Sequence, residues 1–387
     1  MAEQTSESHP PRVLLLSASV GAGHNAAARA ILQGLADSDA DVATGWMDAM
    51  DWAPRWFRAY YAGGFALSMT RLPRAYGVGF RLTDRPHRPG RSPGERLRLC
   101  WERRAMRRLA DRVQELQPEL IINTHFVSTP IVGRLIRQGR LTCRQVVVVT
   151  DNIVHRWWYA RNVEHWFLPA EKSVEPLRAW GIDRDRLTVS GIPIHPKWYR
   201  PLDETEIRRE WHLPPDRPVV LLSGGAVFTV GPIVDMAREL LEQCPEICLV
   251  VLAGRNKQPL ADLTRLPQAD GRLVPLGYTD RMHELGHVAS LMITKAGGIT
   301  TAECLVKGTP MLLFRPVPGQ EAGNAEHLAE EDAATIIRDP QAVAPAVRDL
   351  LDRPERLAEL SSNCRRLSRP GTHTIVRHVL DMLAGRS

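Results

Sequence analysis

Short apolar runs without polar alternation recur along the chain, and they restrict its fold more than any other feature. Runs of this kind are expected where strands are buried on both faces of a parallel sheet. The predicted strands are 13–16, 119–123, 146–149, 165–168, 187–189, 218–222, 247–252, 290–294 and 311–314. Segments with helical character, such as 25–35 and 231–243, lie between them. The sequence therefore predicts repeated strand–helix units of the α/β class.

A proline-rich stretch without hydrophobic pattern, 191–201, divides these strands into two groups. The length of 387 residues also suits about two domains. We therefore expect an N-terminal domain over 11–195 and a C-terminal domain over 196–387. Each is expected to be a Rossmann-like, doubly wound sheet, and the two are expected to face each other across a cleft. The final helix could pack back on the N-terminal domain.

Composition excludes several classes of protein. The first ten residues are polar, and no apolar run approaches the ~18 residues that a membrane span needs. The six cysteines are scattered, and Cys244 and Cys248 have no matching Cys or His pair that would complete a zinc site. Unpaired thiols are typical of a reducing compartment. We expect a cytoplasmic protein without a bound metal.

Positive charge is concentrated between residues 55 and 108. This stretch holds fourteen arginines, no lysine and three acidic residues, a net charge of +11, which leaves −5 for the rest of a chain whose net charge is +6. Aromatic residues lie beside the arginines, namely Trp52, Trp56, Phe57, Tyr60, Tyr61 and Phe65. Arginines next to aromatic rings suit an anionic membrane interface. Nucleic acid or simple solvation of a helix face are the alternatives. We expect the segment 52–108 to contact a membrane surface and not nucleic acid.

Two candidate bases follow predicted strands of the N-terminal half. His24 lies in a glycine-rich turn that opens the first helix, where it is either a helix cap or a neutral general base. Asp151 ends a run of valines, where it is a second candidate base, a residue that orients His155, or a helix cap. The turn around His24 also matches a dinucleotide fingerprint weakly, with Asp48 as the acid that this fingerprint requires.

The C-terminal half alternates glycine turns with polar side chains. The turns at 223–225 and 297–298 open helices and can present backbone N–H groups to an anion. Glu303 is expected on the helix that follows the second turn. Gln320, Glu321 and Asn324 are expected on a loop after the next strand. Carboxylate and amide groups bind sugar hydroxyls, so this half predicts a ligand with a phosphate end and a polyol end. A nucleotide sugar has both.

Five motifs in this order resemble the diacylglycerol glycosyltransferases of glycosyltransferase family 28, the group of monogalactosyldiacylglycerol synthases and processive glucosyltransferases. They lie at 19–25, 149–158, 191–194, 295–303 and 318–324, within a match that runs from about residue 13 to residue 331. The resemblance implies a GT-B fold whose C-terminal domain holds a UDP-sugar and whose N-terminal domain holds the lipid acceptor. It also implies inversion at the anomeric carbon without a cofactor.

The resemblance assigns roles by position. Glu303 is expected to bind the ribose, Gln320 and Glu321 the sugar, and 223–225 the diphosphate. The candidate catalytic residues are His24 and Asp151. The candidate substrate-binding residues are Gly23, Asn25, His155, Trp158, Ser223, Gly224, Gly225, Lys295, Gly297, Gly298, Thr300, Glu303, Gln320, Glu321 and Asn324.

The expected activity is transfer of a hexose from a UDP-sugar to the hydroxyl of diacylglycerol, at the cytoplasmic face of the membrane. A GT-B enzyme with another acceptor, a nucleotide-sugar epimerase and a non-catalytic basic binding module are the alternatives. The sequence leaves open whether the sugar is glucose or galactose, and whether a second sugar is added.

Overall fold

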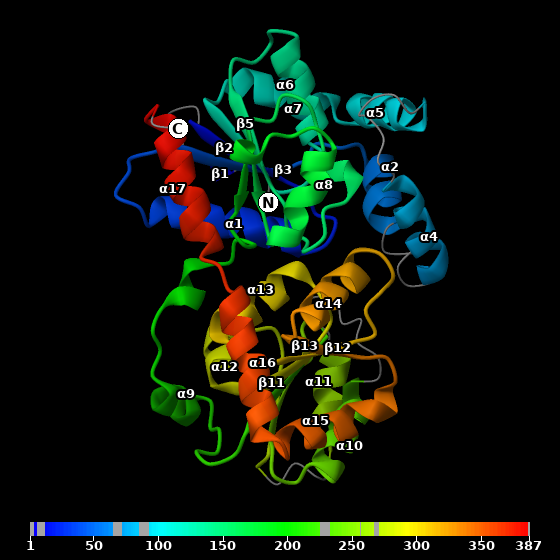
Figure 1. Cartoon of the computed structure of the whole chain (residues 1–387), viewed down its shortest axis with the longest axis vertical. Helices are drawn as coiled ribbons and strands as arrows, with labels where there is room; N and C mark the ends of the chain where they lie inside the picture. Colours follow the sequence, from blue (N-terminus) through cyan, green and yellow to red (C-terminus); the bar gives the residue numbers. More distant parts are fainter. Residues whose placement is uncertain are drawn as a thin grey trace. The chain divides into compact units, whose positions relative to one another are not determined.

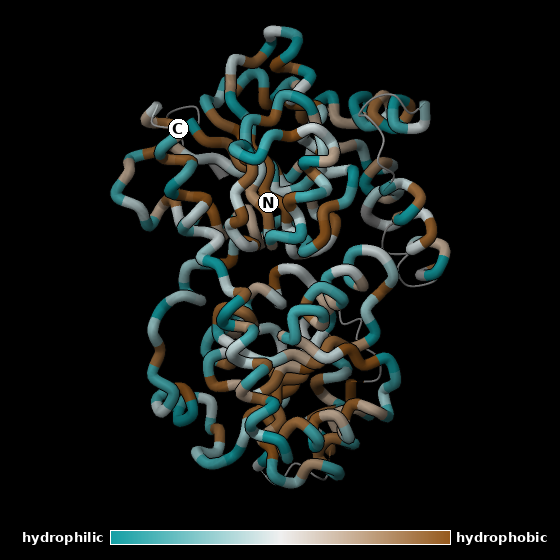
Figure 2. The backbone as a smooth tube through the Cα atoms, viewed as in Figure 1, coloured by the Kyte–Doolittle hydropathy of each residue, from teal (hydrophilic) through white to brown (hydrophobic). Residues whose placement is uncertain are grey.

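The structure is a computed structural model that describes residues 4–5, 12–64, 72–84, 93–224, 233–255, 257–266 and 271–385. The chain forms two compact units. The first contains Met1–Pro196, Pro318–Gln320 and Arg369–Ser387, and the second contains Lys197–Val317 and Glu321–Ser368. In each unit the apolar residues concentrate in the strands, while the helices alternate apolar and polar residues (Figure 2).

The first unit contains a seven-stranded sheet in the order β1-β3-β2-β4-β5-β6-β7. All neighbouring strands are parallel except β1, which pairs antiparallel with β3. The chain passes from β2 to β3 on one side and then returns to β4 on the other, so the switch point of the sheet lies between β2 and β4. The strands are Gln4–Thr5, Val13–Ser17, Thr44–Asp48, Leu120–Asn123, Arg144–Val148, His165–Leu168 and Leu187–Val189 for β1 to β7.

Helices cover both faces of this sheet. On one face, α1 (Gly23–Ala36) packs beside the C-terminal helix α17 (Gly371–Leu383), and both bury aliphatic side chains against β2 and β4 (Figure 1). On the other face, α6 (Arg107–Leu116) and α7 (Thr129–Arg137) form a second core with the opposite side chains of β2. The remaining helical segments are α2 (Arg55–Arg58), η1 (Ala59–Gly63), α4 (Pro73–Thr83), α5 (Pro93–Ala105), η2 (Arg156–Trp158), η3 (Glu171–Ser173), α8 (Val174–Ala179), η4 (Arg184–Arg186) and η5 (Pro196–Tyr199), the last of which spans the boundary of the two units.

The second unit contains a six-stranded, fully parallel sheet in the order β10-β9-β8-β11-β12-β13. Its switch point lies between β8 and β11, for the same reason as in the first sheet. The strands are Val219–Ser223, Cys248–Leu252, Leu273–Leu276, Ala289–Thr294, Met311–Phe314 and Ala334–Ile337 for β8 to β13. The helices are α9 (Glu204–Glu210), α10 (Ile233–Gln243), α11 (Lys257–Leu263), α12 (Met282–Val288), α13 (Gly298–Lys307), α14 (Gln320–Glu330), η7 (Pro340–Ala342), α15 (Val343–Leu351) and α16 (Pro354–Leu367).

The predicted fold class is confirmed, because both units are doubly wound α/β sheets. Two details of the prediction are wrong. Gln320, Glu321 and Asn324 lie on the first turns of α14 and not on a loop, since the helix starts directly after the Pro318–Gly319 turn. Phe57, expected at a membrane surface, is fully buried in the core of the first unit. Within the described residues, no helix is long and apolar enough to cross a bilayer.

Candidate functional site

His24 lies at the switch point of the first sheet. It is the second residue of α1, directly after the turn that follows β2. Its Nδ1 lies 3.0 Å from the carbonyl oxygen of Thr124, which follows β4, and 2.9 Å from Oγ1 of Thr150, which follows β5. A carbonyl oxygen only accepts hydrogen bonds, so the ring hydrogen is on Nδ1. In this tautomer Nε2 carries the lone pair that a general base needs.

The surroundings of His24 keep its ring neutral. Burial lowers its pKa to about 4, and this effect outweighs the hydrogen bond to Thr124 and the charge of Asp48, which both act in the opposite direction. The ring of His125 meets that of His24 edge to face, with 4.5 Å between their centroids, and burial also lowers the pKa of His125. At pH 7 the imidazole of His24 is therefore unprotonated and able to accept a proton.

Asp48 is fully engaged by the loop around His24. Its two carboxylate oxygens accept from the backbone N–H groups of Ser19 and Met50, from the Ser19 hydroxyl and from the Asn25 amide. This network fixes the turn between β2 and α1 and fills the carboxylate's hydrogen-bonding capacity. A dinucleotide site needs an acidic residue that can accept hydrogen bonds from a ribose. Asp48 was the candidate for this role, and its oxygens are already engaged, so the structure argues against the dinucleotide interpretation.

His155 and Trp158 are buried and make contacts within the first unit. His155 is buried, its Nε2 lies 3.0 Å from the carbonyl oxygen of Phe80, and its Nδ1 accepts from the backbone N–H of Trp157. Trp158 is also buried and packs in the same apolar core as Phe126. Their contact with a substrate stays a prediction. Asp151 is half-buried and follows Thr150 at the carboxyl end of β5.

The second switch point gathers the candidate residues of the C-terminal half. Ser223 ends β8 and Gly224 follows it, while Lys295 and Gly297 follow β11. Gly225 lies outside the described residues. Gly297 caps α13 without a side-chain hydrogen bond, and Gly298 and Thr300 occupy the first turn of this helix. The first N–H groups of α13 have no partner within the helix, so this end can accept an anion.

Charged and amide side chains of α14 lie next to the residues that follow β11. Lys295 Nζ donates to Glu321 Oε1 at 2.8 Å, and the other oxygen of this buried carboxylate accepts from the backbone N–H of Val317. Asn324 donates to the carbonyl oxygen of Ala296 at 3.0 Å. The structure thus brings Lys295, Glu321 and Asn324 together. The expected convergence of Glu303 with Gln320 and Glu321 stays a prediction.

Glu303 has an unusual ionisation state. It is half-buried on α13, and burial raises its pKa to about 8, although the charge of Lys197 and a hydrogen bond from Trp198 favour the carboxylate. The carboxyl group is therefore largely protonated at pH 7. Strongly perturbed carboxyl groups cluster at functional sites, which fits a side chain that meets a polar ligand.

The sequence did not reveal the contribution of Thr124. It lies directly after β4, and its contact with His24 joins residues that are 100 positions apart. Its place at the carboxyl end of a strand next to the switch point is the signal that could have identified it.

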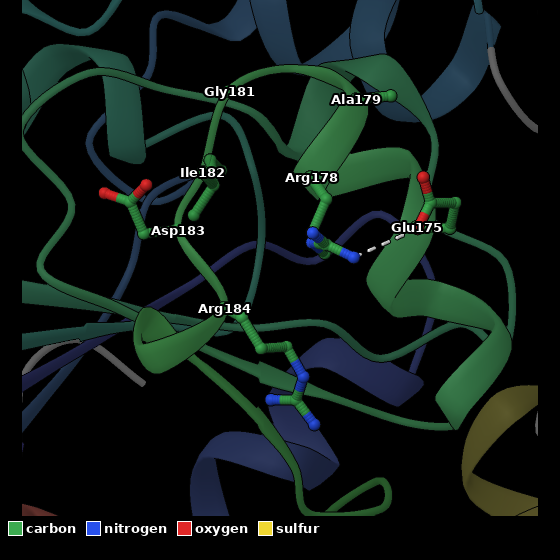
Figure 3. A pocket seen from close by; sticks show the side chains of 7 residues that line it. All are labelled: Glu175, Arg178, Ala179, Gly181, Ile182, Asp183 and Arg184. Carbon is green, nitrogen blue, oxygen red and sulfur yellow. Dashed lines mark ion pairs between the residues drawn. The ribbon is translucent and has the colours of Figure 1, made fainter.

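A surface pocket of about 300 Å³ lies at the end of α8 and contains none of the candidate residues. Figure 3 shows its charged side chains, including the ion pair between Arg178 and Glu175 at 3.7 Å. It is lined by Glu175, Arg178, Ala179, Gly181, Ile182, Asp183 and Arg184.

Two doubly wound units with polar residues at their switch points define a protein of the GT-B class. Solved structures share this fold over nearly the whole chain. UDP-GlcNAc 2-epimerase from Neisseria meningitidis bound to UDP-GlcNAc has a TM-score of 0.61 at 13% identity and covers 96% of this chain and 99% of its own. The glycotransferase of kitacinnamycin has a TM-score of 0.61 at 15% identity and covers 97% and 99%. A transferase and an epimerase are thus equally similar, so the fold does not separate these activities.

Sequence comparison is more specific. Residues 24–194 match the family model of monogalactosyldiacylglycerol (MGDG) synthase, and residues 220–373 match the C-terminal domain of glycosyltransferase family 28. A curated relative from Staphylococcus saprophyticus, named processive diacylglycerol beta-glucosyltransferase, is 32% identical over 268 residues, which is 69% of this chain and 68% of that protein. The chain belongs to glycosyltransferase family 28, in its group of diacylglycerol glycosyltransferases.

Proposed function

We propose that this protein transfers a hexose from a UDP-sugar to the hydroxyl of diacylglycerol, with inversion at the anomeric carbon and without a metal cofactor. The observation that carries this proposal is the match of residues 24–194 to MGDG synthase and of residues 220–373 to the C-terminal domain of glycosyltransferase family 28, together with the 32% identity to a relative named processive diacylglycerol beta-glucosyltransferase. The neutral ring of His24 at one switch point and the polar residues at the other support it.

The second unit would bind the donor. Backbone N–H groups at the start of α13 and in the turn after β8 are suited to the diphosphate. Glu303 would accept hydrogen bonds from the ribose hydroxyls. Gln320 and Glu321 would contact the sugar, and Lys295 would hold Glu321 in place through their 2.8 Å ion pair.

The first unit would supply the base. The acceptor hydroxyl gives its proton to Nε2 of His24, its oxygen forms a bond to the anomeric carbon, and the bond from this carbon to the UDP oxygen breaks. UDP leaves with the electron pair, and the imidazolium later loses its proton to solvent. A base of this kind contributes roughly 10²–10⁴-fold to the rate. Asp151 is the alternative base.

The segment 52–108 would bring the enzyme to the lipid at the cytoplasmic face of the membrane. Its described part exposes large apolar side chains that a water-facing helix would avoid, with Trp56 52% and Leu97 72% exposed. On α4, Val78 and Leu82 are one turn apart and both exposed, while Phe80 anchors the opposite face in the protein. The exposed arginines of this part are Arg55, Arg74, Arg81, Arg96, Arg104, Arg107 and Arg108. Apolar groups beside arginines favour an anionic interface.

A transfer assay tests the proposal. Purified protein is incubated with diacylglycerol in mixed micelles and with UDP-glucose, UDP-galactose or UDP-N-acetylglucosamine, with and without a chelator. Mass spectrometry identifies the glycolipid, and the anomeric proton coupling in its NMR spectrum reports inversion. We expect a β-linked hexosyl-diacylglycerol that forms equally well with the chelator. Interconversion of the UDP-sugar without acceptor would instead indicate an epimerase, and transfer only to a soluble alcohol would refute the lipid acceptor.

A further inference from the structure

We propose that Thr150 is a positioning residue that, together with the backbone carbonyl of Thr124, holds His24 in the tautomer with its hydrogen on Nδ1. This inference rests on the proposed role of His24 as the base and adds a residue to that role. Thr150 thereby has a role of its own, separate from that of Asp151, which follows it in the chain.

The geometry around the ring supports this assignment. Nδ1 of His24 lies within hydrogen-bond distance of two oxygen atoms, the carbonyl of Thr124 at 3.0 Å and Oγ1 of Thr150 at 2.9 Å. The Thr124 hydroxyl in turn donates to the carbonyl oxygen of His24 at 3.0 Å. Thr124 is fully buried and Thr150 is 4% exposed, so little water competes for these contacts. Three connections at the carboxyl edge of one sheet thus converge on one imidazole.

The two contacts have different roles. The Thr124 carbonyl can only accept, and it therefore requires the hydrogen on Nδ1. The Thr150 hydroxyl can accept or donate, so it follows this choice and fixes the ring in its plane. Without this hydroxyl, the ring keeps a single contact at Nδ1 and can turn, which moves the lone pair of Nε2 away from its position. A hydrogen on Nε2 would abolish the basic function altogether.

Two neighbouring titratable groups, Asp48 and His125, make hydrogen bonds to other partners. Asp48 is held by Ser19, Asn25 and Met50 and acts on His24 only through its charge. His125 meets the ring edge to face, and its own Nδ1 accepts from the backbone N–H of Val127 at 3.0 Å. Asp151 follows Thr150 in the chain and is half-buried.

Three variants separate positioning from stability. Thr150→Val keeps the shape and removes the hydroxyl, and Thr150→Ser restores it. Thr129→Val is the matched control, because Thr129 is also buried in the same unit and its hydroxyl has no hydrogen-bond partner among the residues that the structure describes. We expect Thr150→Val to lower kcat about three- to tenfold, the effect of one hydrogen bond, with an unchanged KM for the donor. Thr150→Ser and Thr129→Val should stay within about twofold of the wild type. Equal kcat in Thr150→Val and Thr129→Val would overturn the assignment.

An NMR measurement tests the tautomer without relying on activity. In protein with ¹⁵N-labelled histidine, long-range ¹H–¹⁵N spectra at pH 7 distinguish the protonated from the unprotonated ring nitrogen, and the His24→Gln variant identifies the signals of His24. We expect hydrogen on Nδ1 in the wild type, in Thr150→Ser and, because the Thr124 carbonyl remains, in Thr150→Val, where the ring signals of His24 should broaden because the ring can turn. Hydrogen on Nε2 in the wild type would overturn the proposal. The expected spectra would support it even if the transfer assay revealed another acceptor, so the two proposals fail separately.

Discussion

The raised pKa of Glu303 predicts an unusual pH dependence of stability. Below pH 4.5 this carboxyl group is protonated in both the folded and the unfolded chain and has no effect. Between pH 4.5 and about 8 the unfolded chain loses the proton while the folded chain keeps it, so stability falls as the pH rises. Above pH 8 the effect is complete. Replacement of Glu303 by Gln keeps the shape and the hydrogen-bonding capacity but removes this proton equilibrium.

The size of the effect follows from the shift. One pKa unit corresponds to about 1.4 kcal/mol, so a change from 4.5 to about 8 is worth at most about 5 kcal/mol. Glu303 is only half-buried, and solvent reduces this to about 2–3 kcal/mol. We therefore expect the stability of Glu303→Gln, measured relative to the wild type, to rise by about 2–3 kcal/mol between pH 5 and pH 9.

Calorimetric unfolding of both proteins at several pH values, without ligand, measures this difference. Glu284→Gln in the same unit is a control of opposite sign. Burial raises the pKa of Glu284, but hydrogen bonds from Arg281 and Trp211 outweigh it and lower the pKa, so this variant should lose stability above pH 4.5. A constant difference between Glu303→Gln and the wild type across the pH range would refute the reasoning.

Three further predictions concern the proposed reaction. Calorimetric titration above pH 8, where Glu303 is ionised, should show that Glu303→Ala weakens UDP binding by roughly 10- to 150-fold, the loss of a charge-assisted hydrogen-bonded pair of about 1.5–3 kcal/mol, and unchanged affinity would remove Glu303 from the ribose site. Steady-state kinetics should show that His24→Ala lowers kcat by about 10²–10⁴-fold with little change in donor affinity, whereas an active His24→Ala beside an inactive Asp151→Asn would make Asp151 the base. In vesicle flotation, binding to anionic vesicles should exceed binding to neutral ones and weaken with salt. Tyr60→Gln should reduce it and Tyr278→Gln should not, although both tyrosines are 62% exposed; equal effects would argue against docking through 52–108.

The strands that the sequence revealed are those with uninterrupted aliphatic runs, such as β2, β5 and β12. The missed strands carry residues that weaken this signal. β3 contains Gly45 and ends in Asp48, and β10 contains Pro275, which is tolerated because β10 is an edge strand. β13 is only four residues long. The architecture could still be predicted, because the recognised strands are enough to show that strands alternate with helices, which is the pattern of a doubly wound sheet.

The candidate site was only partly predictable, for a different physical reason. Lys295 and Glu321 follow consecutive strands, so their pairing could be expected from topology alone. The neighbours of His24 come from strands that are about 100 and 126 residues away in the chain, and their distances depend on packing. The prediction that Phe57 lies at a membrane surface failed for a similar reason. Trp56 and Phe57 are adjacent in the sequence, and the sequence does not reveal which of the two rings enters the core. Trp56 is the exposed member of this pair.

The two switch points follow one rule of topology but differ in electrostatics, and this difference fits the proposed reaction. The first surrounds His24 with neutral partners, two threonines and a neutral histidine, and confines the charge of Asp48 to a closed network. This arrangement keeps the ring unprotonated at pH 7, because a close unpaired carboxylate would raise its pKa. The second presents a helix N-terminus, Lys295 and a paired Glu321. The hydrogen-bond donors of this helix N-terminus match a ligand that carries a diphosphate. The same fold can therefore hold a proton acceptor in one unit and an anionic donor in the other, because each switch point brings together side chains from different strands.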